Sequence, residues 1–304
     1  MLLTGASGFV GSRALRALVR RGHEVHAVSA RPREGASDVV WHAADLLQAD
    51  AAHEVVERAR PELMLHLAWY AEHGRFWTSV ENVRWVEATL RLLRAFAARD
   101  GRRVALAGTC AEYEWSVEGG VCSEEDTPLR PATLYGVSKH ATRAVSQALA
   151  DEAGFELAWG RIFFLYGPGE AGTRLVPSVV QPLLEGEPAA VSEGSQVRDF
   201  LHVDDVAEAF VALLESDVCG PVNIGSGEGV AVRQVIELIG EITGRSDLIR
   251  FGTVARRLDE PATLVAGVRR LRDEVGFRPH IELGDGIAAT IAWWQDQRRS
   301  AVGG

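Results

Sequence analysis

The residues best placed to do chemistry are a tyrosine and a lysine four positions apart, in the segment Tyr135-Gly136-Val137-Ser138-Lys139. Lys139 is the one lysine among the 32 basic residues of the chain. On a helix, residues four apart lie on one face. An ammonium group beside a phenol favours the phenolate, so we expect the pKa of Tyr135 to fall from about 10 toward neutrality. Such a phenol can exchange a proton with a substrate oxygen while a hydride moves at the attached carbon. A helical surface pair is the alternative interpretation.

A hydroxyl group is expected to join this pair. The segment Arg103–Ala107 has the pattern of a buried strand and runs into Gly108-Thr109. Open α/β sheets bind their ligands at the carboxyl ends of the strands, so Thr109 is expected to face the same cleft as Tyr135 and Lys139. These three residues are the predicted catalytic set. Alternatively, Thr109 only caps the end of the strand.

A glycine-rich turn separates the first expected strand, Met1–Thr4, from the first expected helix, Phe9–Arg21. Gly5 permits a tight turn, Gly8 lets the backbone approach a pyrophosphate, and Gly11 lets the helix pack closely on the strand. The start of the helix adds free N–H groups and a positive dipole for phosphates. The spacing therefore predicts a dinucleotide site, although a turn without a ligand is the alternative. The residues expected to bind the cofactor here are Gly5, Ser7, Gly8, Phe9, Val10 and Gly11.

The second expected strand, Glu24–Ser29, indicates which dinucleotide is bound. An NAD site usually carries an acidic residue at the end of this strand to hold the ribose hydroxyls. Here the strand ends in Ser29, and Arg31 and Arg33 follow. Guanidinium groups can hold a 2′-phosphate with paired hydrogen bonds. We therefore predict NADP, with contacts from Ser29 and Arg31, and keep NAD as the alternative in which both arginines are ordinary surface residues.

The elements that must position these residues alternate between strand and helix. This alternation predicts an α/β fold: a Rossmann-type, doubly wound parallel sheet covered on both faces. From Gly167 onward Pro and Gly become denser, which indicates a smaller C-terminal α/β lobe. We expect a dinucleotide-binding domain over residues 1–166, a mainly substrate-binding lobe over 167–297 with some elements returning to the sheet, and a fraying tail over 298–304. The remaining expected strands are 39–42, 63–68 and 156–164, and the remaining expected helices are 53–60, 80–99, 133–153, 203–214 and 233–243.

Composition excludes several classes of protein. The 304 residues are 47% hydrophobic and 24% charged, which is typical of a soluble globular chain. A net charge of −10 disfavours nucleic acid as the main partner. Three irregularly spaced cysteines argue against a disulfide framework or a metal site and favour the cytoplasm. No apolar run approaches the roughly 18 residues of a transmembrane helix, and Met1–Thr4 leads straight into the glycine turn rather than into a signal peptide.

Together these segments resemble a known family. The TGxxGxxG spacing resembles that of the short-chain dehydrogenase/reductase superfamily. The Tyr-x-x-x-Lys helix, His66-Leu67-Ala68 and the segment 198–205 narrow the resemblance to its extended branch, the NAD-dependent epimerase/dehydratase family that acts on nucleotide sugars. It covers Met1 to about Trp294. The resemblance implies a nucleotide-diphosphate sugar as substrate, and a homodimer formed through the two long helices, with a monomer as the alternative.

The resemblance also implies roles for individual residues. Tyr135 matches the catalytic base, Lys139 the ribose-binding lysine and Thr109 the hydroxyl that orients the substrate. Arg198 matches the arginine that grips the substrate diphosphate, and a surface arginine paired with Asp199 is its alternative. Further cofactor residues are implied at Asp45, Leu46, Leu67, Ala68 and Asn82, where Asp45 has the alternative role of N-cap of the next turn. Substrate contacts are expected from Trp69, with a core aromatic as the alternative, and at Phe164, where many relatives have Asn.

The chain departs from the family where dehydratases carry an acid and a base directly after the strand-end threonine. Here these positions are Cys110 and Ala111. Alanine cannot take a proton, and a free cysteine is usually a core residue. We therefore expect an NADPH-dependent ketoreductase of a nucleotide-activated 4-keto-6-deoxysugar rather than a dehydratase. The alternatives are a nucleotide-sugar 4-epimerase with tightly held NAD and a cofactor-binding protein without turnover.

Overall fold

The computed structural model describes residues 1–33, 38–116, 119–255 and 260–302. Within these residues, a seven-stranded sheet has the strand order β11-β7-β5-β4-β1-β2-β3. Every pairing between its strands is parallel. The strands are β1 (Leu2–Thr4), β2 (Val25–Ser29), β3 (Val39–Ala43), β4 (Leu63–His66), β5 (Arg103–Thr109), β7 (Glu156–Ile162) and β11 (Gly220–Ile224).

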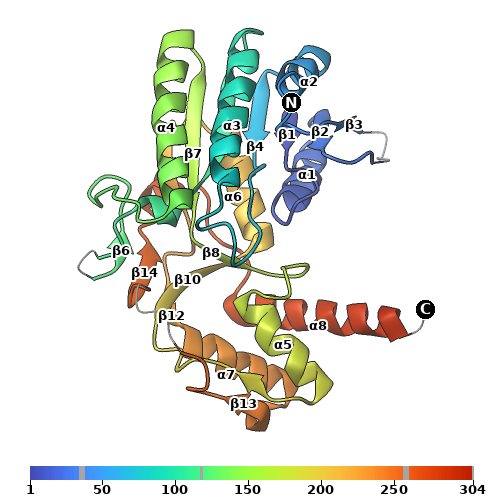
Figure 1. Cartoon of the computed structure of the whole chain (residues 1–304), viewed down its shortest axis with the longest axis vertical. Coiled ribbons are helices and arrows are strands. Elements are labelled where there is room, and N and C mark those ends of the chain that lie inside the picture. The colour runs from blue at the N-terminus through green and yellow to red at the C-terminus, as the bar shows by residue number, and fades with distance from the viewer. Residues whose placement is uncertain (34–37, 117–118, 256–259, 303–304) are drawn as a thin grey trace.

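Helices cover both faces of this sheet, as the sequence predicts (Figure 1). On one face, apolar residues of α1 (Gly11–Arg20) and α6 (Val203–Glu215) form one core with the strands. On the other face, α2 (Ala51–Ala59), α3 (Glu81–Ala97) and α4 (Leu134–Ala153) form a second core. Both sets of helices are amphipathic and bury their apolar sides against the strands. The architecture is a doubly wound α/β fold.

The strand order reverses between β1 and β4, because β2 and β3 lie to one side and β5, β7 and β11 to the other. A crevice opens outside the carboxyl ends of the strands at such a point. The glycine turn follows β1, residues 67–77 follow β4, and Thr109 ends β5. The topology therefore brings three separate predicted segments to one edge of the sheet.

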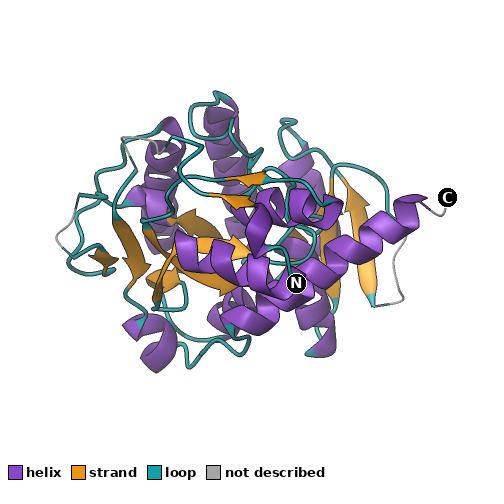
Figure 2. Ribbon diagram, turned by 90° about the horizontal axis from the view of Figure 1, so that it is seen from below, coloured by secondary structure: helices purple, strands orange, loops and turns teal. Residues whose placement is uncertain are grey.

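A second lobe packs below this edge (Figure 1). Its sheet has the order β12-β10-β14-β6, and β8 pairs with β10. Figure 2 shows the helices of this lobe from below. The strands of its main sheet are β6 (Val121–Cys122), β8 (Phe164–Tyr166), β10 (Val197–His202), β12 (Gly229–Ala231) and β14 (Thr263–Ala266), and β9 (Ala189–Ala190) pairs separately with β13 (Ile249–Arg250). The helices are α5 (Leu175–Glu185), α7 (Val232–Thr243) and α8 (Leu283–Val302). The short helical turns of the chain are η1 (Cys110–Glu112), η2 (Ser246–Leu248) and η3 (Arg270–Glu274).

Several expectations about the elements were wrong, and the strand expected over 63–68, for example, ends at His66. The strand expected over 156–164 ends at Ile162, because the Phe163 N–H donates to the Ile224 carbonyl (3.1 Å) and the chain then joins the second sheet as β8. The tail expected at 298–304 is part of α8 as far as Val302, and residues 303–304 lie outside the described residues. The first helix begins at Gly11, two residues later than expected, because the turn occupies residues 5–10.

The chain beyond residue 167 does not form a lobe entirely of its own. α6 packs against α1 and the sheet, and β11 extends the sheet beyond β7. Among the described residues no helix is long and apolar enough to cross a membrane.

Candidate active site

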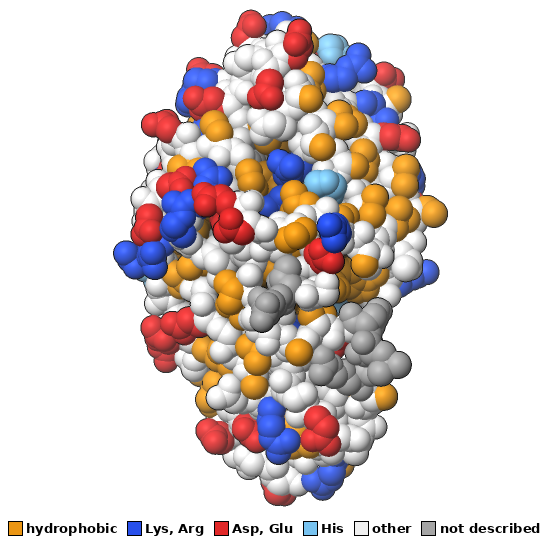
Figure 3. Space-filling model, turned by 90° about the vertical axis from the view of Figure 1, so that its left-hand side faces the viewer, with side chains coloured by type: hydrophobic (Ala, Val, Ile, Leu, Met, Phe, Trp, Pro, Cys, Tyr) orange, Lys and Arg blue, Asp and Glu red, His pale blue; other side chains and the backbone are white. Residues whose placement is uncertain are grey.

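A cavity of about 780 Å³ lies along the carboxyl edge of the main sheet, within the range of cofactor and ligand sites. Figure 3 shows one face of the molecule, on which hydrophobic side chains lie among acidic and basic ones. Most of the predicted site residues line this cavity. They are Gly5, Ser7, Gly8, Phe9, Val10, Gly11, Ser29, Asp45, Leu46, Leu67, Ala68, Trp69, Thr109, Tyr135, Lys139, Phe164 and Arg198.

The glycine turn has no room for larger side chains. Gly5 has a φ of +69°, and a Cβ added there would lie 2.8 Å from the backbone nitrogen of Ala68. A Cβ on Gly11 would lie 2.0 Å from the carbonyl oxygen of Gly5. Bare backbone and the start of α1 therefore face the cavity, an arrangement that accepts a pyrophosphate. The residues present fit a dinucleotide cofactor.

Of the three residues expected to determine whether NAD or NADP binds, Ser29 lines the cavity, and Arg31 and Arg33 do not. Ser29 is buried at the end of β2, lines the cavity, and accepts a hydrogen bond from the Arg31 backbone N–H (3.3 Å). The Arg31 side chain is exposed and does not line the cavity, and the Arg33 guanidinium lies 5.7 Å from the centre of the Trp41 ring. The binding role of Arg31 stays a prediction.

Asp45 lies at the cavity in the turn after β3, where its carboxylate accepts a hydrogen bond from the Leu47 N–H (3.1 Å). The Gln48 N–H also donates to the Asp45 carbonyl (2.9 Å), so Asp45 caps the turn that follows it, as the alternative interpretation predicted. The binding of the cofactor by Asp45 stays a prediction.

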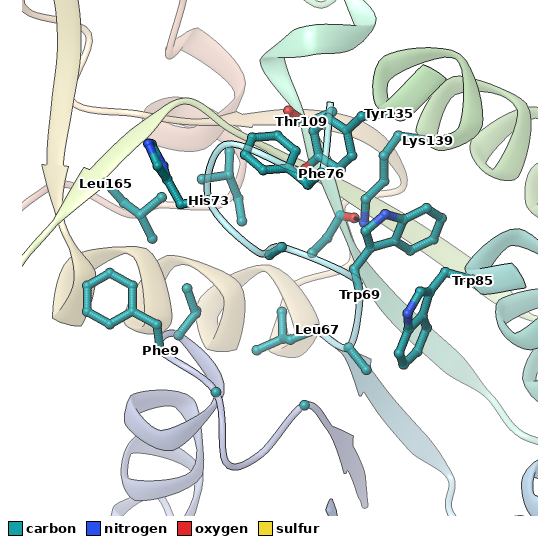
Figure 4. A pocket seen from close by; sticks show the side chains of 18 of the residues that line it. Phe9, Leu67, Trp69, His73, Phe76, Trp85, Thr109, Tyr135, Lys139 and Leu165 are labelled. Carbon is teal, nitrogen blue, oxygen red and sulfur yellow. Dashed lines mark hydrogen bonds between the residues drawn. The ribbon is translucent and has the colours of Figure 1, made fainter. Parts of the chain in front are cut away.

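Thr109 and Tyr135 meet at the inner end of the cavity (Figure 4). Thr109 is the last residue of β5, and its Oγ1 accepts a hydrogen bond from the Ala111 N–H (3.2 Å). Tyr135 lies in the first turn of α4, which Thr133 caps by accepting from the Gly136 N–H (3.1 Å). Thr109 thus caps the turn after the strand, as its alternative role predicted, and is also hydrogen-bonded to Tyr135, whereas its catalytic role stays a prediction.

The expected fall in the pKa of Tyr135 was wrong. Burial raises the pKa of Tyr135 well above its usual value, and the hydrogen bond with Thr109 only partly opposes this effect. Lys139 does not offset the burial, because its ammonium group turns away from the phenol. Its Nζ donates to the Ala107 carbonyl (2.7 Å) and lies 3.7 Å from the centre of the Trp69 ring. Burial also lowers the pKa of Lys139, to about 7.

Aromatic side chains surround the phenol. Phe76 meets the Tyr135 ring edge-on at 4.8 Å, and Trp77 does so at 5.8 Å. Trp115 packs perpendicular to Trp77 at 5.9 Å. Trp77 lies in the segment after β4 that also carries Trp69, and the sequence analysis did not identify Phe76 or Trp115. The signal available for Trp115 was its place six residues after Thr109, in the loop at the same strand end.

A polar cluster of three residues at the cavity was also not predicted from the sequence. It consists of His73, Glu170 and Arg174. The Glu170 carboxylate accepts from the Arg174 Nε (3.2 Å), and burial raises its pKa to about 7. His73 follows β4, and the other two follow β8. Their position after the carboxyl ends of strands could have identified them.

Asn82 does not line the cavity, contrary to the role implied by the resemblance. Its side chain is completely buried, and its Nδ2 donates to the carbonyls of Phe76 (2.7 Å) and Ser79 (2.9 Å). Its Oδ1 accepts from the Trp69 Nε1 (2.9 Å). Asn82 therefore holds the loop after β4 and the indole of Trp69.

Arg198 is buried at the cavity rather than exposed on the surface. It is 2% exposed, forms an ion pair with Glu260 (2.7 Å), and donates to the Pro261 carbonyl (2.9 Å). Its guanidinium lies 5.3 Å from the centre of the Phe164 ring. Asp199 instead accepts from the backbone N–H groups of residues 226, 227 and 266. The alternative of a surface pair between Arg198 and Asp199 was wrong.

The two residues after Thr109 are not suited to act as a catalytic acid and base. Cys110 and Ala111 are both buried, and burial raises the pKa of the Cys110 thiol. The next residue, Glu112, is fully buried, accepts from the Thr109 N–H (2.9 Å), and pairs with Arg161 (3.0 Å). It therefore holds the loop that carries Thr109. Among the described residues no cluster of His, Cys, Asp and Glu is arranged to bind a metal ion.

A dinucleotide-binding turn beside a threonine, a tyrosine and a lysine is the arrangement of an oxidoreductase that depends on a dinucleotide cofactor. The sequence model of the NAD dependent epimerase/dehydratase family matches residues 1–225. The chain belongs to this family, and it is an enzyme of the type that acts on nucleotide sugars.

Individual relatives have several activities. A UDP-glucose 4-epimerase of Corynebacterium glutamicum is 31% identical over 93% of this chain and 92% of its own. A dTDP-glucose 4,6-dehydratase of Streptomyces griseus is 28% identical over 98% and 94% of the two chains. Among solved structures, MoeE5 in complex with UDP-glucose and NAD has a TM-score of 0.83 and 30% identity, and the match covers 99% of each chain.

Proposed function

We propose that this protein uses NADPH to reduce the keto group of a nucleotide-activated 4-keto-6-deoxysugar. The observation that carries the proposal is the meeting of Thr109, Tyr135 and Lys139 at one cavity, next to positions that cannot serve as the acid and base of an elimination. The enzyme keeps the groups needed for hydride chemistry and lacks those for dehydration.

The state of Tyr135 supports reduction. The phenol keeps its proton at neutral pH, as a donor to a keto oxygen must, and burial, which raises its pKa, favours this protonated state. An epimerase must begin with the opposite step, in which the tyrosine removes a proton from a sugar hydroxyl. Thr109 would hold the same oxygen by a hydrogen bond. The bound nicotinamide supplies the hydride.

Three further roles belong to this proposal. The glycine turn and α1 would hold the cofactor pyrophosphate, and Lys139 the ribose. Arg198 lines the cavity, and its guanidinium would exchange Glu260 for the substrate diphosphate. Phe76, Trp77 and Trp115 offer apolar faces to the sugar ring.

The preference for NADPH is the finer part of the proposal, since the family is NAD-dependent and MoeE5 binds NAD. It is supported by Ser29, which stands at the end of β2 in place of a ribose-binding carboxylate, and by the nearby Arg31. Within the part of the chain that the structure describes, β2 itself ends in Ser29 and not in an acidic residue.

A nucleotide-sugar 4-epimerase is the second candidate, and the similarity to the Corynebacterium glutamicum epimerase favours it. The two candidates differ in how they use the cofactor. An epimerase returns the hydride to the same sugar, whereas a reductase consumes it and must exchange its cofactor in each cycle.

Isotope transfer tests the proposal. The protein is incubated with a 4-keto-6-deoxy nucleotide sugar and NADPH carrying deuterium at the transferable position of the nicotinamide. A reductase places the label at C4 of the sugar. Nucleotide released on denaturing the purified protein is identified in parallel. Tightly held NAD together with an unlabelled sugar would support the epimerase instead.

We also propose a homodimer and a cytoplasmic location. α3 and α4 pack side by side, and each carries exposed valines near its start, such as Val83 on α3 and Val137 on α4. Such unpaired apolar positions are suited to a helical interface between two copies, which light scattering of the purified protein would test. The described cysteines are free thiols, as expected in a reducing compartment.

A further inference from the structure

The Trp69 side chain connects a buried amide with the ammonium group of Lys139. Its Nε1 donates to the Asn82 Oδ1 (2.9 Å), and the Asn82 Nδ2 is held in turn by two backbone carbonyls. The centre of the Trp69 ring lies 3.7 Å from the Lys139 Nζ. Figure 4 shows Lys139 reaching down from α4 to this indole, with Trp85 beyond it. The orientation of the indole is therefore fixed on one edge while its face meets the cation.

The contact between Trp69 and Lys139 is important because few other groups stabilise the positive charge of the Lys139 ammonium group. Lys139 is 4% exposed, and among the described residues its one hydrogen bond is to the Ala107 carbonyl. A buried ammonium group with so few partners loses much of its solvation free energy. The negative face of an indole compensates part of this loss, and more so where water is excluded.

The charged and titratable groups around Lys139 do not replace the indole. Glu112, on η1, favours the ammonium form, but its carboxylate is already paired with Arg161 of β7. His66, at the end of β4, has a pKa lowered to about 3 by burial and is neutral. Tyr135, on the same helix, is neutral because its pKa is raised. Beside the Ala107 carbonyl, Trp69 is thus the close partner that favours a charged Lys139.

We propose that Trp69 is a positioning residue for Lys139: the indole face holds the ammonium group at the cavity, and Asn82 acts through Trp69 by holding the indole. The contact itself does not depend on which reaction the enzyme performs. Only its effect on turnover rests on the proposed role of Lys139 in catalysis.

The single lysine of the chain makes the proposal directly measurable. Protein grown with lysine labelled with carbon-13 at Cε gives one lysine signal by nuclear magnetic resonance, and that signal is Lys139. Protons above an aromatic face move upfield through the ring current. We expect an upfield Hε signal in the full-length protein, and a pKa, read from the Cε signal, well below that of a free lysine.

Substitutions distinguish the effect of the Trp69 indole on Lys139 from the effects of neighbouring residues. Trp69→Leu keeps apolar bulk but removes the ring, so the upfield shift should vanish and the pKa of Lys139 should fall by about one unit. Trp69→Phe keeps a weaker ring and should give intermediate values. Asn82→Ala should reduce the upfield shift without touching the lysine. Trp85→Leu is the matched control: Trp85 lies 6.3 Å from Trp69 in the same cavity, and its loss should leave the Lys139 signal unchanged.

Two results would overturn the proposal. One is a wild-type Hε signal at the position of a solvent-exposed lysine. The other is a Trp69→Leu variant that is folded by circular dichroism and has the wild-type shift and pKa. Trp69→Phe serves the same purpose if the leucine variant does not fold. The kinetic readout is separate: the limb of the rate–pH profile set by Lys139 should move with the measured pKa. A chain without reductase activity would refute the proposed function and leave the resonance result intact.

Discussion

Among single residues, Tyr135 is central to the proposed reduction because it donates the proton. Tyr135→Phe removes the phenolic hydroxyl but keeps the ring that packs on Phe76 and Trp77. Turnover should fall by about 10²–10⁴-fold, the usual contribution of a positioned acid, while cofactor affinity stays the same. Steady-state kinetics and calorimetric titration with the cofactor check the two parts. Full activity in this variant would exclude Tyr135 as the acid.

Arg31 carries the prediction about the 2′-phosphate. Arg31→Ala should weaken NADPH binding by about tenfold or more, because a charge-assisted hydrogen bond is lost, and should leave NADH binding unchanged. Arg33→Ala is the matched control, since this guanidinium lies against Trp41. Calorimetry with both cofactors measures the effect. Equal losses for NADPH and NADH, or none for either, would remove the basis for the NADP preference.

The sequence predicted those site residues whose roles are local. The spacing of Gly5, Gly8 and Gly11 and the step from Tyr135 to Lys139 are properties of one turn and one helix. The state of Tyr135 was not predictable in this way, because it depends on burial and on the direction in which Lys139 extends. The same holds for Asn82, whose amide is bound to a loop and an indole rather than to the cavity.

At the scale of elements, the turn between β1 and α1 must stay free of side chains. In Gly11→Ala the new Cβ would lie 2.0 Å from the Gly5 carbonyl oxygen, so the backbone must shift. We expect a loss of stability of about 1–3 kcal/mol, as for other overpacked sites, and at least a tenfold loss in cofactor affinity. Thermal unfolding with and without cofactor measures both effects.

Gly284→Ala is the control for this experiment. Gly284 lies in α8, and an added Cβ there would meet no neighbouring atom within 4 Å. Because Ala is the better helix former, this variant should be as stable as the wild type or slightly more stable. If Gly11→Ala behaved like Gly284→Ala, the turn would not be the tight cradle that the account requires.

The sequence predicted most elements within a few residues, because strand and helix patterns are local. It missed the break between β7 and β8 because residues 156–164 are mostly apolar and contain no turn-forming residue near Phe163. The break at Phe163 arises from a hydrogen bond to Ile224, some 60 residues further along the chain, which no local pattern contains.

At the scale of the whole molecule, the two parts of the chain share one sheet. A fragment of residues 1–166 would lack β11 and also α6, which has nine buried residues and covers one face of the sheet with α1. We expect this fragment to show no cooperative unfolding transition, because the exposed apolar face cannot be compensated. Circular dichroism during heating, compared with the full chain, makes the test. A cooperative transition would show that the predicted domain boundary at residue 166 is a real folding boundary.

The central claim is that hydride is consumed rather than returned, and cofactor stoichiometry tests it most directly. A 4-keto-6-deoxy nucleotide sugar is mixed with NADPH and the full-length protein, and the nicotinamide absorbance is followed while the sugar is quantified by chromatography. The account predicts one NADPH oxidised for each keto sugar converted to its hydroxyl product. Interconversion of hydroxyl epimers with no net loss of NADPH would contradict it and establish the epimerase in its place.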